Sequence, residues 1–136
     1  MNRFENKTVV ITGAAGGIGE ATTRRIVSEG GKAVIADHSK ERAERLAAEL
    51  NALGADVRPV YFSATELQSC KDLIAFAMKE YGQVDVLVNN VGGTNPKRDT
   101  DIETLDMDYF DEAFHLNLSC TMYLSQLVIP IMSTHG

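Results

Sequence analysis

Four short runs of β-branched and other apolar residues stand at regular intervals along the chain, and Gly, Asp, Ser or Asn follows each of them. Such runs are typical of strands that are buried on both faces of a parallel sheet. They lie at residues 8–12, 32–36, 57–62 and 84–88. The pattern therefore predicts four strands with similar environments.

Amphipathic segments with apolar residues at helical spacing separate these runs. The first helix is predicted over Glu20–Glu29. We expect Ser39 to cap the second, which ends at Gly54. Thr65 begins a capping-box pattern for the third, which ends at Gly82. Strands and helices of these lengths alternate in the order that parallel sheets with right-handed crossovers require.

A polar loop from Gly92 to Thr104 follows the fourth strand, and one long helix is predicted from about Asp106 to near Pro130. Because this helix is apolar on nearly all sides, we expect the sheet and a neighbouring helix or subunit to cover it. This indicates a homo-oligomer. The whole pattern predicts an α/β doubly wound parallel sheet in a single domain of residues 1–136.

The composition narrows the class of partner. The chain has 136 residues, a formal net charge of −6 and no basic run, which argues against binding to nucleic acid or an anionic membrane surface. Its longest apolar stretches fall short of the roughly 20 residues that a membrane-spanning helix needs. A small-molecule partner is therefore expected.

The two cysteines, Cys70 and Cys120, fit no metal-ligand spacing, and we interpret both as buried thiols. The N-terminal residues lack the basic and then apolar pattern of a secretory signal. These features predict a reduced cytoplasmic setting and no metal site.

A glycine-rich turn links the first strand to the first helix. Residues without a Cβ let the backbone approach a pyrophosphate, and the N-terminus of the following helix offers N–H groups and a positive dipole end. The candidate cofactor-binding residues of this turn are Gly13, Gly16, Gly17, Ile18 and Gly19.

Asp37 stands 18 positions after Gly19, just past the second strand, where a carboxylate accepts hydrogen bonds from the adenosine ribose and repels a 2′-phosphate. Gly16 and Asp37 leave no basic side chain to pair with such a phosphate, although His38 is near. We therefore predict NAD in preference to NADP. The alternative is that the glycines only form a turn and Asp37 only caps the next helix.

The stretch from Thr12 to Gly19 resembles the TGxxxGxG motif of short-chain dehydrogenases/reductases, and Asn89 to Gly92 resembles their NNAG motif. The resemblance runs along the whole chain and implies the N-terminal half of a Rossmann fold with strand order 3-2-1-4. The glycines alone also satisfy the spacing of the extended, epimerase-type members. The Asn89 to Gly92 element favours the short-chain branch.

The resemblance implies roles for further residues. Asn90 and Gly92 would line the cofactor groove, where Val91 replaces the usual alanine. Ser63 stands where the family usually has an aspartate that contacts the adenine, which leaves the Ala64 backbone for that contact. Asn117 matches the helix asparagine that holds a water in the family's proton relay. Local hydrogen bonding within a helix is the alternative role for Asn117.

Residues 88–96 and 114–120 are most similar to bacterial members that oxidise the 7α-hydroxyl of bile acids. The resemblance therefore implies an oxidoreductase that transfers hydride between NAD and a secondary alcohol or ketone, with a steroid as the expected substrate. Activity as a 3-oxoacyl reductase or a cyclic diol dehydrogenase of the same family is the alternative.

The family uses a Tyr whose pKa a Lys four residues later lowers, and a Ser that orients the substrate. No Tyr of this sequence has Lys four positions later. We therefore expect a domain truncated before the fifth strand and the catalytic Ser, Tyr and Lys, able to hold a cofactor but inactive alone. The competing hypothesis is a genuine short product that acts as a non-catalytic nucleotide-binding or interaction module.

Overall fold

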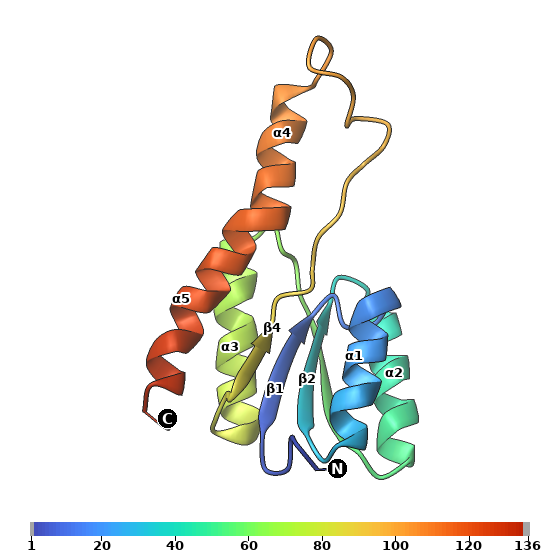
Figure 1. Cartoon of the computed structure of the whole chain (residues 1–136), viewed down its shortest axis with the longest axis vertical. Coiled ribbons are helices and arrows are strands. Elements are labelled where there is room, and N and C mark those ends of the chain that lie inside the picture. The colour runs from blue at the N-terminus through green and yellow to red at the C-terminus, as the bar shows by residue number, and fades with distance from the viewer. Residues whose placement is uncertain (1, 135–136) are drawn as a thin grey trace.

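Four parallel strands form one sheet in the computed structural model, which describes residues 2–134. They are β1 (Thr8–Thr12), β2 (Lys32–Asp37), β3 (Asp56–Tyr61) and β4 (Val86–Val88). Their order across the sheet is β3-β2-β1-β4, which confirms the predicted fold class and strand order. The carboxyl ends of the strands therefore share one edge of the sheet (Figure 1).

Helices cover both faces of this sheet, as the alternating pattern predicts (Figure 1). They are α1 (Gly17–Ser28), α2 (Lys40–Ala52), α3 (Leu67–Tyr81), α4 (Met107–Phe114) and α5 (Cys120–Met132), with a π-helical segment, η1 (His115–Ser119), between the last two. Helices α1 and α2 lie on one face, and α3 and α5 lie on the other.

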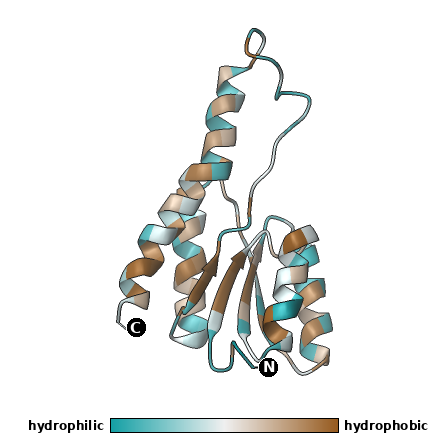
Figure 2. Cartoon of the chain, in the orientation of Figure 1, coloured by the Kyte–Doolittle hydropathy of each residue, from teal (hydrophilic) through white to brown (hydrophobic). Residues whose placement is uncertain are grey.

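Alternation along the strands builds two apolar cores, one on each face. In β1, Val9 and Ile11 pack under α1 and α2, whereas Val10 packs under α3 and α5, and all three are fully buried. Figure 2 shows these strands as the most continuously hydrophobic part of the chain. Each strand therefore stabilises both layers of helices through its two faces.

Cys70 and Cys120 lie buried in the core on the α3 and α5 side, as predicted. Burial is the main reason that the pKa of the Cys120 thiol rises to about 12, and the neighbouring Cys70 thiol raises it further. The pKa of Cys70 is also raised by burial. Both thiols are therefore held protonated and unreactive at neutral pH.

Two predictions about helix ends and continuity are wrong. The capping box at Thr65 does not form, because α3 begins at Leu67 with Glu66 as its cap residue, and the Thr65 hydroxyl contacts Ser63 instead. The long last helix is interrupted, because η1 separates α4 from α5. The extra residue of a π-helical turn changes the direction in which the side chains of that segment point.

Helices α4 and α5 are covered less completely than their composition suggests. Within residues 107–132, the buried side chains are those of Tyr109, Cys120, Leu124 and Val128. Six large apolar residues of the same range remain exposed, namely Met107, Phe110, Phe114, Leu118, Met122 and Ile129. One side of this helical stretch therefore packs on the protein and the other faces solvent.

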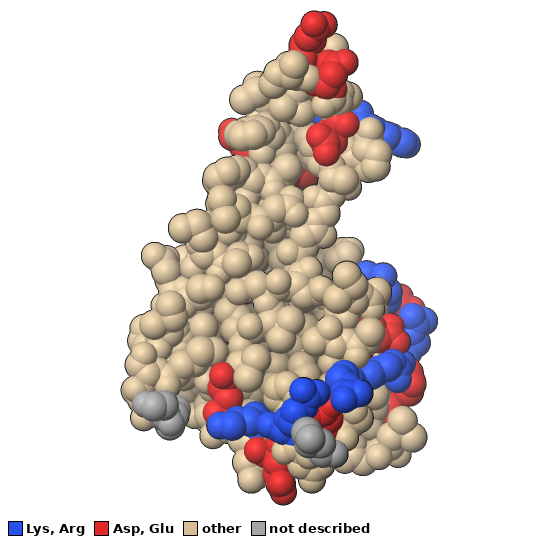
Figure 3. Space-filling view, in the orientation of Figure 1, with Lys and Arg blue, Asp and Glu red and all other residues tan. Residues whose placement is uncertain are grey.

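Helix α4 and the loop before it project beyond the carboxyl edge of the sheet as an arm (Figure 1). In the view of Figure 3, charged residues gather over the lower part of the molecule and near the tip of this arm, with a largely uncharged surface between them. None of the helices in the described residues is long and apolar enough to cross a membrane.

Candidate functional site

The glycine-rich turn lies at the carboxyl end of β1, where the strand passes into α1. Gly13 and Gly17 have φ angles of +61° and +51°, in the left-handed region that favours glycine. Gly16 is the N-cap of α1 and has no side chain, so the cap residue itself does not block the helix N-terminus. The N–H groups of Gly19 and Glu20 donate to the Gly16 carbonyl, at 3.1 and 3.4 Å. The N–H groups of Gly17 and Ile18 precede these bonds and are the ones that a helix N-terminus offers to an anion.

Gly19 allows the first turn of α1 to pack directly against the end of β1. A Cβ on Gly19 would fall far inside van der Waals contact with the Gly13 carbonyl oxygen and 2.7 Å from Nδ2 of Asn90. A larger residue at this position would push the helix away from the strand. The glycine is therefore needed for close packing, whichever ligand the turn receives.

Asn90 links the glycine turn to β4. Its Nδ2 donates to the Thr12 carbonyl at 2.9 Å and to the Gly13 carbonyl at 3.0 Å. The Thr12 hydroxyl accepts from the backbone N–H groups of Asn90 and Val91, each at 3.1 Å. The two neighbouring strand ends are thus held together at the point where the strand order reverses, which is where doubly wound folds bind ligands.

Asp37, at the end of β2, lies beside the glycine turn with only 2% of its surface exposed. Its Oδ2 accepts from the Ala15 N–H at 3.0 Å, and its Oδ1 accepts from the Ser39 N–H at 2.9 Å. The carboxylate therefore ties the turn to the start of α2. This geometry fits both roles considered for Asp37, because a carboxylate oxygen can accept further hydrogen bonds.

The structure places Arg42 near Asp37, in addition to the His38 that the sequence analysis named. Nη2 of Arg42 stands 3.4 Å from Oδ1 of Asp37, and Nδ1 of His38 stands 3.4 Å from the same atom. Arg42 comes five residues after Asp37, but Ser39 caps α2 and accepts from the Arg42 N–H. The first turn of the helix therefore carries the arginine back to the end of β2, and the Ser39 cap is the sequence signal for it.

Ala64 and Ile18, two further predicted cofactor-binding residues, differ strongly in exposure to solvent. Ala64 follows β3 and is 8% exposed, whereas the Ile18 side chain in the first turn of α1 is 78% exposed. The preceding Ser63 N–H donates to the Ser69 hydroxyl at 2.9 Å, so the segment before Ala64 is fixed against α3.

Asn117 lies in η1 and faces the loop that follows β4. Its Oδ1 accepts from the Gly93 N–H at 2.9 Å, and its Nδ2 donates to the Gly93 carbonyl at 2.8 Å. A Cβ on Gly92 would lie 2.9 Å from the same Oδ1. Asn117 therefore makes long-range contacts as well as a local bond to the Ala113 carbonyl.

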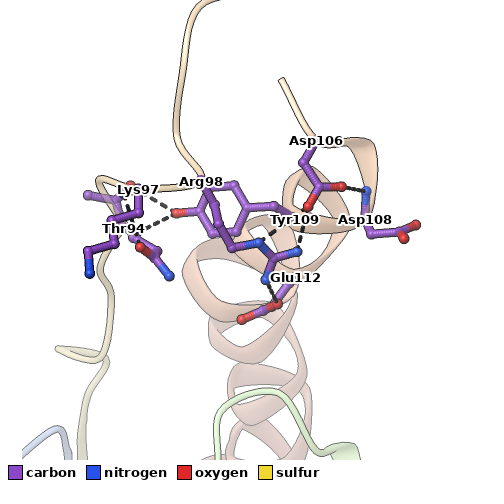
Figure 4. Close-up of polar contacts among 8 residues, drawn as sticks. Thr94, Lys97, Arg98, Asp106, Asp108, Tyr109 and Glu112 are labelled. Atoms are coloured by element: carbon purple, nitrogen blue, oxygen red, sulfur yellow. Dashed lines mark hydrogen bonds and ion pairs between the residues drawn. The ribbon is translucent and has the colours of Figure 1, made fainter. Parts of the chain in front are cut away.

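A second set of contacts fixes the outer part of the loop to α4 (Figure 4). The Tyr109 hydroxyl accepts from the Asn95 N–H at 2.6 Å, and the Arg98 guanidinium stacks on the Tyr109 ring, 5.0 Å from its centroid. Arg98 also pairs with Asp106 and Glu112, each at 2.8 Å. The hydrogen bond to Arg98 is the main reason that the pKa of Asp106 is lowered. Arg98 therefore holds the loop rather than standing free in solvent.

Taken together, the turn, Asp37, Asn90 and Gly92 line one edge of the sheet in an arrangement that fits a dinucleotide. The glycine turn offers backbone N–H groups to a pyrophosphate, and Asp37 offers oxygens to a ribose. No group of His, Cys, Asp and Glu side chains within residues 2–134 could hold a metal ion.

Comparison with known proteins gives one family. The profile of the short chain dehydrogenase family matches residues 7–136. The chain is 83% identical to the 7α-hydroxysteroid dehydrogenase of Bacteroides fragilis over all 136 residues, which are 52% of that protein. It is 35% identical to a 3-oxoacyl-[acyl-carrier-protein] reductase of Thermotoga maritima, covering 96% of this chain and 52% of that protein.

Solved structures agree with this result. A 7α-hydroxysteroid dehydrogenase complexed with NADH and 7-oxo glycochenodeoxycholic acid matches with a TM-score of 0.91 at 34% identity. The match covers 98% of this chain and 51% of that chain. The chain thus spans about half the length of the relatives that it matches.

Proposed function

The chain belongs to the short-chain dehydrogenase family, and we propose that it is the cofactor-binding part of an NAD-dependent oxidoreductase that acts on the 7α-hydroxyl of a bile acid or steroid. The observation that carries the proposal is the continuous edge formed by the glycine turn, Asp37 and Asn90. Its strand-helix-strand context is the one in which such a turn binds a dinucleotide.

Within this proposal, each group on the edge has one task. The N-terminus of α1 binds the pyrophosphate through the backbone of Gly16, Gly17 and Ile18, and Asp37 accepts from the hydroxyls of the adenosine ribose. The Ala64 backbone contacts the adenine. Gly92 lets the loop pass close to the cofactor, and the bound NAD supplies a nicotinamide ring that accepts or returns hydride.

Asn117 has a supporting task in this proposal. Through Gly93 it fixes the path of the loop beside the cofactor groove. We assign it an assisting role in positioning a water for proton transfer, as the family resemblance implies. Oxidation of the substrate also needs a base that accepts the proton of the reacting hydroxyl. These 136 residues do not contain the Tyr and Lys, four positions apart, that supply this base in the family.

The steroid substrate follows from identity rather than from a pocket in this chain. The Bacteroides relative at 83% identity acts, by its name, on 7α-hydroxysteroids, and the solved relative holds a 7-oxo bile acid with NADH. The Thermotoga reductase at 35% identity makes a 3-oxoacyl substrate the second candidate. Because the identity to the hydroxysteroid dehydrogenase is far higher than the identity to the reductase, a bile acid is the favoured substrate.

The proposal extends to the setting of the whole protein. The exposed apolar residues of α4 and α5 support a homo-oligomer, because monomeric proteins rarely leave large contiguous apolar patches in water. The acidic net charge supports a small-molecule partner rather than nucleic acid or a membrane surface. A cytoplasmic location is part of the same proposal.

Turnover assays with the protein expressed from its complete reading frame test the function. We expect NAD reduction with 7α-hydroxy bile acids, followed by the absorbance of NADH, and little or none with 3-hydroxyacyl thioesters or cyclic diols. Bile acids that lack the 7α-hydroxyl serve as the control. Equal turnover of the control bile acids, or turnover only of the thioester or diol, would overturn the substrate assignment.

A further inference from the structure

The guanidinium of Arg42 stands between the glycine turn and Asp37. Its Nη2 is 3.4 Å from Oδ1 of Asp37, and its Nη1 is 3.4 Å from the position that a Cβ on Gly16 would take. The hydroxyls of an adenosine ribose bound as proposed would occupy this same space, between Gly16 and the Asp37 carboxylate. Arg42 and the ribose therefore compete for the carboxylate.

Arg42 is free to leave this position without loss of the site. Its side chain is 44% exposed, and 3.4 Å is a long separation for an ion-paired hydrogen bond. Asp37 keeps its bonds from the Ala15 and Ser39 N–H groups when Arg42 moves. The carboxylate is thus fixed by the backbone, whereas the Arg42 guanidinium has the Asp37 carboxylate as its one hydrogen-bond partner among residues 2–134.

Arg42 lies in a cluster of charged side chains whose charges balance only while Asp37 is ionised. A small polar pocket beside it is lined by Arg24, Arg45, Glu20 and Glu49 among others. Both glutamates are engaged by Arg24, at 2.8 Å each. Three arginines thus face two glutamates here, and Asp37 supplies the further negative charge that balances the region. Removal of the Asp37 charge leaves the region positive.

We propose that Arg42 determines how strictly the site excludes a 2′-phosphate. This inference rests on the proposed dinucleotide site. With the carboxylate present, Asp37 holds Arg42 and repels a phosphate, so the site takes NAD. Where the carboxylate is neutralised, Arg42 turns to the 2′-phosphate and the site accepts NADP. Asp37 thus acts partly by controlling an arginine that would otherwise bind the wrong cofactor.

Binding measurements with 5′-AMP and 2′,5′-ADP test the proposal without any turnover. These two probes differ only in the 2′-phosphate, and calorimetry gives the dissociation constant of each for the full-length protein. The variants are Arg42→Ala, Asp37→Asn and the double variant. Lys40→Ala is the matched control, because it removes one positive charge from the same helix turn at a residue that pairs with Glu44 instead.

We expect Arg42→Ala to strengthen 5′-AMP binding and to weaken 2′,5′-ADP binding, so that their ratio shifts about tenfold or more toward 5′-AMP. Asp37→Asn should improve 2′,5′-ADP binding, and adding Arg42→Ala should remove that gain. Lys40→Ala should leave the ratio nearly unchanged. The Arg42→Ala variant keeps both backbone bonds to Asp37, so its result does not depend on a disrupted turn.

Two outcomes separate this inference from the proposed function. If 5′-AMP binds the parent protein and the double variant holds 2′,5′-ADP as well as Asp37→Asn does, the role of Arg42 is refuted while the cofactor site stands. An equal change with Lys40→Ala would also refute it, because the effect would then be one of overall charge. If neither probe binds the folded parent protein, the dinucleotide site itself is wrong.

Discussion

Asn117 and Gly93 are joined by a reciprocal pair of hydrogen bonds, one from the Gly93 N–H to Oδ1 at 2.9 Å and one from Nδ2 to the Gly93 carbonyl at 2.8 Å. The residues are 24 positions apart, and the pair fastens the loop after β4 to η1. Single π-helical turns within helices often occur at functional sites. Here the π-helical segment η1 carries the Asn117 side chain that binds the loop. The contact fixes where the projecting arm begins.

Asn117→Ala removes both of these bonds, so the N–H and carbonyl of Gly93 hydrogen-bond to water instead. We expect a loss of about 1–2 kcal/mol in the free energy of unfolding, since each such bond contributes roughly 0.5–1.5 kcal/mol. Hydrogen exchange at Gly93 should accelerate more than exchange in the sheet. Urea denaturation and exchange measured by mass spectrometry give the two values.

His115→Ala is the control for that prediction. His115 lies in the same π-helical segment, but among the described residues its Nδ1 contacts just the local Asp111 carbonyl, at 2.8 Å. Exchange at Gly93 should stay near that of the parent protein. Equal acceleration in both variants would mean that the helix segment, and not the Asn117 pair, fixes the loop.

Gly19→Ala should be one of the most damaging single-methyl additions in the chain. The new methyl group has no room between the Gly13 carbonyl and Nδ2 of Asn90, and overpacking of this kind costs about 1–3 kcal/mol. The displaced turn should also lose its affinity for ADP. Gly93→Ala adds the same methyl group with no atom within 4 Å, so its stability should change far less. Denaturation curves of the two variants make the comparison.

The elements that the sequence predicts well are those that depend on local pattern. A run such as Val9, Val10 and Ile11 is apolar at every position, which only a strand with helices on both faces can bury. The glycine turn is equally local, because its positive φ angles and its close packing require particular residues at fixed positions. The strand order was predicted from the family resemblance, because the positions of four strands along the chain do not determine their order in the sheet.

The features that the sequence did not predict depend on where a long side chain reaches or on a small local energy difference. Arg42 is adjacent to Asp37 only because the helix turn brings it back, and the pattern of apolar positions carries no record of that contact. Thr65 has the right partners for a capping box, yet its hydroxyl contacts Ser63. The two alternatives differ by one hydrogen bond, which is too small for the pattern to decide.

Glu29 should make stability depend on pH in the acid range. Its carboxylate is 4% exposed and pairs with Arg3 and Arg25. The hydrogen bond from Arg3 is the main reason that its pKa falls from 4.5 to about 2. Because the pKa is lower in the folded state, this stabilisation is present above about pH 4.5 and is lost as the pH falls toward 2.

The variant Glu29→Gln should therefore melt at a lower temperature than the parent protein at pH 7. The two melting temperatures should converge between pH 4.5 and pH 2, as the parent protein loses the contribution. Glu44→Gln is the control, since Glu44 is exposed and its ion pair within the described part of the chain is the long one with Lys40, at 3.7 Å. A constant difference between the parent and Glu29→Gln over this range would contradict the assignment.

Tyr109→Phe should loosen the outer part of the loop while the sheet keeps its stability. The Tyr109 ring is 5% exposed and stays packed in the variant, but the Asn95 N–H loses its acceptor and Thr94 loses a partner at 2.9 Å. We expect the free energy of unfolding to fall by about 1 kcal/mol and hydrogen exchange at Asn95 to become faster.

Tyr81→Phe is the control, because it removes a hydroxyl from α3 that contacts Asp56 at 2.9 Å, at a site distant in sequence from the loop. That variant should lose comparable stability without faster exchange at Asn95, because its contact joins α3 to β3. If both variants changed the exchange of Asn95 alike, the loop would be responding to global stability and not to the Tyr109 hydroxyl.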